Sequence, residues 1–161
     1  MKKTILFVAL IAAILFTGIS CSSTRSAEED PYAPVLRGRW YTDLPAERSH
    51  LSVGVVDMLS DDFCAALIGS FAEKGIEVTE AGKTADGEIL AEEGLIFVGR
   101  TMDLKISEEG ISLTVEFMLR GVPGGDPFAW FRISHTAPSM EEAIKAISDA
   151  LAGEVAPAFG S

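Results

Sequence analysis

The side chains that could carry out catalysis or bind a metal are few and widely separated in this sequence. Its two histidines, His50 and His135, have no second ligand at the spacing that zinc sites use. Gly82-Lys83-Thr84 ends like a phosphate-binding loop, but Glu77 stands where that motif requires glycine. A nucleophile elbow, G-x-S-x-G, is absent. We therefore predict no catalytic residue, no metal site and no cofactor. The alternative, an enzyme, would require His50, His135 and an acid to converge through folding.

Pairs of neighbouring acids could in principle serve general acid–base catalysis. Most of them fall instead at expected helix starts or in a turn, where acids favour solvation and complement the helix dipole. The four pairs are Asp61/Asp62, Glu92/Glu93, Glu108/Glu109 and Glu141/Glu142. We interpret them as structural, and the chain is not expected to be an enzyme.

The clearest chemical signal lies at Cys21, behind an apolar leader. Lys2 and Lys3 precede an apolar run of about 12 residues, which small residues follow. This is the pattern of a secretory signal peptide over residues 1–20, and the run is shorter than the roughly 20 residues of a membrane span. Thr17 to Cys21 (TGISC) resembles the bacterial lipobox. The resemblance implies cleavage before Cys21 and acylation of its thiol, with ordinary signal-peptide cleavage or an uncleaved anchor as alternatives.

Acylation of Cys21 would make a stable tether. Bacterial lipoproteins carry two or three acyl chains such as palmitate, and two chains are enough for stable anchoring. Serine rather than aspartate follows the cysteine, which by resemblance to enterobacterial lipoproteins points to the outer membrane, facing the periplasm. Cys64 is then the other thiol, and its apolar surroundings predict a buried structural residue.

Composition restricts the partners. The full chain has a net charge of −11, and removal of Lys2 and Lys3 with the signal peptide leaves eleven basic against 24 acidic residues, a net charge of −13. Such a charge disfavours nucleic acid or an anionic membrane surface as the main ligand. Residues 21–34 are polar and proline-containing, as in a flexible linker, and residues 35–161 suit a single small domain.

Hydrophobic periodicity predicts an α/β (α+β) fold in which two main helices pack on a single mixed sheet of about five strands. Continuous apolar runs predict strands at 51–58, 76–79 and 95–98, and alternation predicts a hairpin around 107–110 with Met102, Leu104 and Ile106 turned inward. The expected helices begin at Ser60 and after Ser139, the second with a capping box and an end at Gly153. Residues 88–93 are expected to form one or two further helical turns. The expected order is β-α-β-(short α)-β-β-β-α, and the β-α-β unit should be parallel.

Basic and aromatic residues gather just before this pattern begins, at Arg37, Arg39, Trp40 and Tyr41. The structural interpretation is an extended segment or edge strand that covers the core with Trp40. The functional interpretation is a partner-binding surface, because such residues are typical of interfaces. Arg100, Arg120 and Arg132 fall on neighbouring expected strands and could form one patch, although pairing with local glutamates is the simpler expectation.

The order of elements resembles a group of bacterial envelope-assembly domains: the amino-terminal domain of TolB, CsgG-like secretion lipoproteins and the lipoproteins that activate penicillin-binding proteins. The resemblance lies in the strand Val53 to Val56, the strand Ile96-Phe97-Val98-Gly99 that opens the hairpin, the strand with Trp130, and the last amphipathic helix. It implies a lipid-anchored envelope protein that docks a protein partner. The alternative is a periplasmic binder of a small apolar ligand or lipid.

Overall fold

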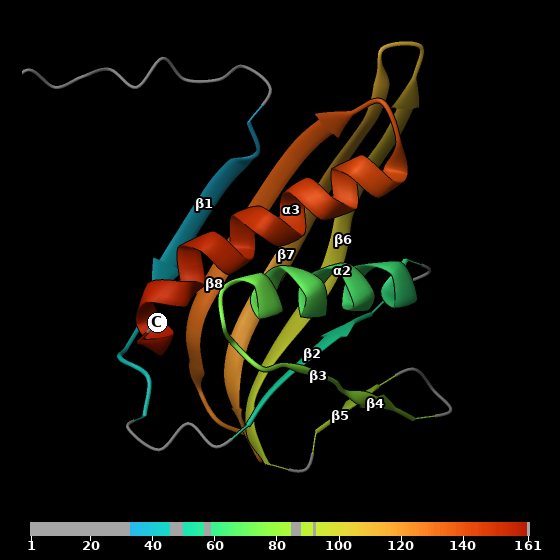
Figure 1. The fold of residues 1–161 in the computed structure, drawn as a ribbon. Coiled ribbons are helices and arrows are strands. Elements are labelled where there is room, and N and C mark those ends of the chain that lie inside the picture. The colour runs from blue at the N-terminus through green and yellow to red at the C-terminus, as the bar shows by residue number, and fades with distance from the viewer. Residues whose placement is uncertain (1–32, 46–49, 57–58, 85–87, 92, 161) are drawn as a thin grey trace, which may run out of the picture. The chain divides into compact units, whose positions relative to one another are not determined.

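A mixed sheet with both long helices on one of its faces forms the centre of the domain (Figure 1). The computed structural model describes residues 33–45, 50–56, 59–84, 88–91 and 93–160, so the expected signal peptide, Cys21 and most of the linker lie outside the described residues. The elements are β1 (Val35–Trp40), β2 (Leu51–Val55), α2 (Ser60–Glu73), β3 (Thr79–Glu80), β4 (Gly82–Lys83), β5 (Ile89–Leu90), β6 (Gly94–Ser107), β7 (Gly110–Val122), β8 (Pro127–Ala137), α3 (Met140–Val155) and the short 3₁₀ helix η1 (Ala156–Phe159).

The main sheet has six strands in the order β1-β8-β7-β6-β2-β3, and β4 and β5 form a separate two-stranded sheet. β2 pairs in parallel with β3 and β6, while β6, β7, β8 and β1 pair antiparallel. The predicted α+β class and the parallel β-α-β unit are confirmed. The predicted count of about five strands was too low, because the segment that begins at Val35 joins the sheet as an edge strand beside β8.

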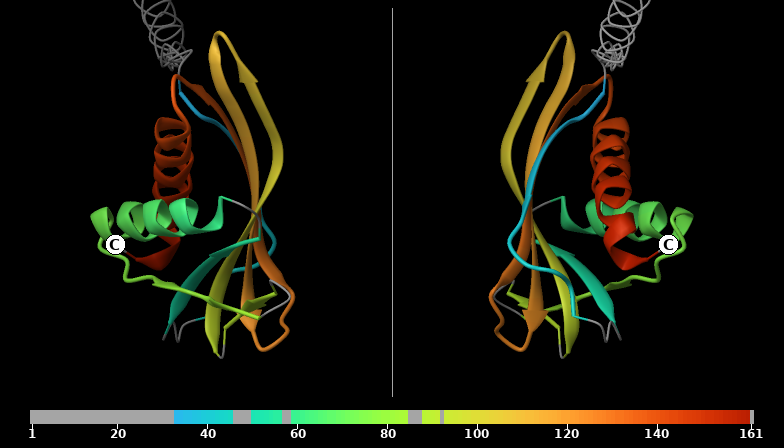
Figure 2. Two further views of the ribbon diagram at one scale, coloured as in Figure 1. Left: turned by 90° about the vertical axis from the view of Figure 1, so that its right-hand side faces the viewer. Right: turned by 90° about the vertical axis from the view of Figure 1, so that its left-hand side faces the viewer.

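Alternation along the strands separates a helix-covered face from a helix-free face (Figure 2). The core lies between the sheet and the two helices, where several large aromatic side chains are almost fully buried. They are Phe63, Phe71, Phe97, Phe117 and Phe131. Burial of each such side chain contributes about 1.5–3 kcal/mol. Cys64 is also fully buried, as predicted, and burial raises the pKa of its thiol.

Several element boundaries differ from the prediction. The helical turn expected at 88–93 is wrong, because the described residues there include the strand β5. The Ile89 side chain of β5 lies over Gly54 of β2, where a Cβ atom would leave it no space. The strand expected at 76–79 lies slightly later in the chain, as β3 (Thr79–Glu80). Helix α2 is preceded by Leu59 in the N-cap position rather than Ser60. Helix α3 does not end at Gly153 but continues to Val155, because Val155 and Ala156 are buried against the core. Ser139 does cap α3, accepting a hydrogen bond from the Glu142 amide at 3.2 Å.

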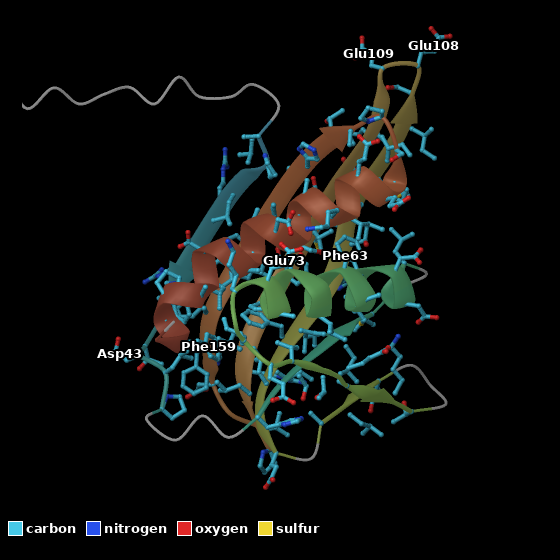
Figure 3. All side chains as sticks on the ribbon, viewed as in Figure 1. Asp43, Phe63, Glu73, Glu108, Glu109 and Phe159 are labelled. Atoms are coloured by element: carbon cyan, nitrogen blue, oxygen red, sulfur yellow. The ribbon has the colours of Figure 1, made fainter. Side chains whose placement is uncertain are left out.

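The burial predicted for Met102, Leu104 and Ile106 is wrong, although the register places Leu104 and Ile106 on the same side of the sheet as Leu113 and Ile111 of β7. Their exposed fractions are 47%, 40% and 75%. The hairpin of β6 and β7 extends past the end of β2, so no described strand flanks these residues on their outer side, and the register shifts between Thr101 and Asp103. Figure 3 labels Glu108 and Glu109 at the tip of this hairpin.

Candidate functional site

All five described arginines lie on the helix-free face of the sheet, which we call the arginine face. The register places Arg37 of β1 opposite Arg132 of β8, Arg132 opposite Glu116 of β7, and Glu116 opposite Arg100 of β6. Side chains of directly paired residues lie on the same side of a sheet, so this row crosses four strands. The face comprises Arg37, Arg39, Arg100, Arg120 and Arg132 with Glu116, Trp130 and Tyr41.

Glu116 is the acid at the centre of this row. The Arg132 guanidinium donates to Glu116 Oε2 from Nη2 at 2.7 Å and from Nε at 3.3 Å. Hydrogen bonds from Arg132 and then Trp130 hold the pKa of Glu116 below its usual range, and Arg100 adds an attractive charge. The preference for pairing with a local glutamate is thus confirmed for Arg132. Within the described residues, Arg37, Arg39, Arg100 and Arg120 form no salt bridge, so the face carries excess positive charge on a chain of net charge −11.

Aromatic rings hold two of these guanidinium groups near the surface. Arg39 lies over the Tyr41 ring, with 5.3 Å between Cζ and the ring centroid, and Arg132 lies over the Trp130 ring at 5.4 Å. A planar guanidinium over an aromatic face loses little conformational freedom when it binds a carboxylate. The arginine face can therefore present preordered donors to an acidic group.

The structure divides the predicted partner-binding residues of the β1 segment between the two faces of the sheet. These residues are Arg37, Arg39, Trp40 and Tyr41. Arg37 and Arg39 are exposed on the arginine face, whereas Trp40 is partly buried on the helix side and packs edge-on against Phe131 at 5.7 Å between ring centroids. The structural interpretation, an edge strand covering the core with Trp40, is confirmed. Partner binding by Arg37, Arg39 and Tyr41 stays a prediction. The alternation of Arg37, Arg39 and Tyr41 with Trp40 is the signal that separates the two faces.

The two histidines are not brought together. His50 Nε2 lies 2.8 Å from Thr79 Oγ1 beside β2, in a hollow of about 340 Å³ that Glu80 and Glu93 also line. His135 lies on β8 and lines another hollow with Val35 and Glu109. Among the described residues, no three histidine, cysteine or acidic side chains gather as a metal site. A further hollow of about 530 Å³ lies near Ile76 and Phe159, and His50 and Glu77 also line it.

In the part of the chain that the structure describes, no helix is both long and apolar enough to cross a membrane. No family model matches the sequence, and no curated protein matches it. Among solved structures, the domain is similar to PelC from Paraburkholderia phytofirmans. A dodecamer of a single-substitution PelC variant superposes with a TM-score of 0.55 at 12% identity over 78% of this chain and 96% of that chain. A second PelC dodecamer gives 0.53 at 14% identity, with the same shares covered. At these identities the likeness shows a shared fold.

Proposed function

We propose that this chain is a lipid-anchored lipoprotein of the cell envelope that acts as a non-enzymatic docking factor, with the arginine face as its contact surface for an acidic protein partner. The observation that carries the proposal is the concentration of the described arginines on one helix-free face. Arginine on a flat, aromatic-containing surface is typical of protein interfaces, and carboxylates are its preferred partners.

The expected anchor gives this surface its mechanism. Acylated Cys21 would hold the domain at the outer membrane, and a linker of the length of residues 22–34 reaches about 20 Å on average. Confinement to a thin layer raises the effective concentration of a partner in the same layer, so a weak interface suffices. PelC, which shares the fold, is a dodecamer.

Crosslinking of the full, anchored chain in living cells tests the proposal. We expect capture of one dominant envelope protein, and we expect the double variant Arg37→Gln/Arg39→Gln to reduce capture about tenfold or more, because arginines at interface centres commonly contribute over 1 kcal/mol each. The matched control is Lys74→Gln/Lys145→Gln, which removes two positive charges from the helices. Capture that survives the arginine variant, or that falls equally in the control, would contradict the proposal.

The alternative, a binder of a small apolar ligand or lipid, rests on the hollow of about 530 Å³, where Leu51, Ile76 and Phe159 lie beside the polar His50 and Glu77. Its test is native mass spectrometry of the purified chain. A co-purifying small molecule that is lost in Ile76→Glu would favour this function over docking.

A further inference from the structure

The outer half of β6 is an uncovered sheet edge. β2 pairs with β6 from Leu95 as far as Gly99, whereas β6 continues to Ser107. Beyond Gly99, no described strand lies beside β6 on the side away from β7, and Figures 1 and 2 show the hairpin projecting past β2 and α2. A bare edge presents unpaired N–H and C=O groups that can accept another strand.

The register identifies which backbone groups point outward. Ser107 and Gly110 pair directly across a two-residue turn, and such an end pair exchanges hydrogen bonds between its two residues. Hydrogen-bonded pairs recur at every second residue along an antiparallel ladder, so Lys105 and Asp103 also bond to β7. The N–H and C=O groups of Leu104 and Ile106 therefore point away from β7, toward solvent.

The side chains along this edge lack most of the features that usually prevent a bare edge from pairing with another strand. Met102, Leu104 and Ile106 account for three of the eight exposed large hydrophobic residues described. Protected edges carry unpaired charges, proline or short strands, but here Asp103 and Lys105 pair with each other at 2.9 Å on the same strand. An exposed, apolar and locally neutral edge of this kind favours pairing with a second strand.

We propose that a second copy of this chain pairs with the first along β6, antiparallel, about a two-fold axis through Leu104. In this register, Leu104 faces Leu104 of the second copy with their outward backbone groups bonded to each other. Asp103 faces Lys105 of the second copy and Lys105 faces its Asp103. Met102 faces Ile106 in the same reciprocal way, so charges and apolar side chains are both matched.

Neighbouring two-fold registers are worse. An axis through Lys105 places Lys105 opposite Lys105, and an axis through Asp103 places two aspartates opposite each other, which destabilises an antiparallel pair. Both axes also fall on residues whose backbone groups are already bonded to β7. Among axes through residues 103–105, the one through Leu104 alone joins free backbone groups and opposite charges.

The pairing has a consequence for the arginine face. Directly opposed residues in an antiparallel pair lie on the same side of the sheet. The two copies would therefore form one continuous sheet, with all helices on one side and both arginine faces on the other. The self-association does not depend on the proposed docking function, because it uses the strand edge and not the arginines.

A single introduced cysteine tests the register in the full, anchored chain. Leu104 faces itself across the axis, so Leu104→Cys should form a disulfide-linked dimer under mild oxidation, because paired Cα atoms at about 5.5 Å are within bridging distance. The matched control is Ile106→Cys. This position is more exposed, at 75% against 40%, but its two copies would stand about 13 Å apart along the strands, beyond reach of a disulfide.

We expect at least tenfold more dimer from Leu104→Cys than from Ile106→Cys or from the parent chain, whose Cys64 is buried. In the Leu104→Cys background, Asp103→Lys should reduce the yield about tenfold, because two attractive pairs become repulsive. Adding Lys105→Asp restores opposite charges and should restore the yield. Equal yields from positions 104 and 106, or no restoration by the charge exchange, would overturn the proposal. The readout requires no partner protein, so its failure is separate from failure of the docking function.

Discussion

Replacing Gly38 by alanine tests whether packing beneath β1 fixes the edge of the arginine face. A Cβ atom on Gly38 would lie 2.4 Å from Cδ1 of Phe131, closer than any relaxed contact. The Phe131 ring is fully buried, with the Trp40 ring centroid at 5.7 Å and the Phe97 ring centroid at 6.5 Å, so its movement away from a new Cβ would disturb both neighbours. Such overpacking costs about 1–3 kcal/mol, whereas loss of glycine flexibility in the unfolded chain returns about 0.4–1 kcal/mol.

The two effects leave a net loss of about 0–2.6 kcal/mol in the free energy of unfolding, which urea denaturation measures. Gly69→Ala is the matched control: it lies in α2 with nothing within 4 Å of its Cβ position, so the same substitution should stabilise the protein by about 0.5–1 kcal/mol. Opposite signs at the two glycines are the central expectation. A Gly38→Ala variant that gains as much stability as Gly69→Ala would refute the packing argument.

A double-mutant cycle then isolates the contact. Phe131→Leu removes the ring atoms that the new Cβ would meet, so Gly38→Ala should cost less in that background, with a coupling of about 0.5–3 kcal/mol. Additive losses would mean that the cost at Gly38 arises elsewhere. Because Arg37 and Arg39 flank Gly38 on β1, loosening of β1 should also weaken partner capture by the arginine face.

Further predictions concern single residues. Glu116→Gln should lose the stability that comes from the lowered pKa of Glu116; this contribution is present above the unfolded-state pKa and disappears as the pH falls through the folded-state pKa, so the urea midpoints of parent and variant should converge in acid. Cys64 is fully buried with a raised pKa, so it should react with a thiol reagent only as fast as the protein unfolds, and rapid labelling of the native chain would contradict this. Ser70 Oγ donates to Asp149 Oδ1 at 2.6 Å and links α2 to α3; Ser70→Ala should therefore cost about 1 kcal/mol by denaturation, and Ser70→Thr should retain part of it.

The sequence was sufficient for features that depend on local pattern. Alternation from Ile111 to Leu119 predicted the hairpin strand and its buried face, and the continuous apolar run at 95–98 predicted a strand, which lies in β6 between β2 and β7. Ser139 and Glu142 predicted the start of α3. These signals succeed because periodic burial and capping act within a few residues, where the sequence fully specifies the interaction.

Features that depend on where the covering elements end were predicted less well. Met102, Leu104 and Ile106 alternate like core residues, but the neighbouring strand β2 stops at Val55 and the hairpin extends beyond it, so these side chains are exposed. The local pattern does not specify where β2 ends. Gly153 is a residue type that commonly ends helices, yet α3 continues to Val155 and the 3₁₀ helix η1 follows, with Val155 and Ala156 buried. In both cases the outcome depends on where other elements lie, which the local sequence pattern does not specify.

The arginine face shows how register creates a site from residues that are remote in sequence. Arg37, Arg100 and Arg132 reach one row only because β1, β6, β7 and β8 pair with particular offsets. A shift of β1 by one residue would turn Arg37 and Arg39 toward the helices and Trp40 toward solvent. Burial of Trp40 against Phe131 therefore specifies the register, and the register in turn orients the arginines. The proposed docking surface consequently depends on a core contact on the opposite side of the same strand.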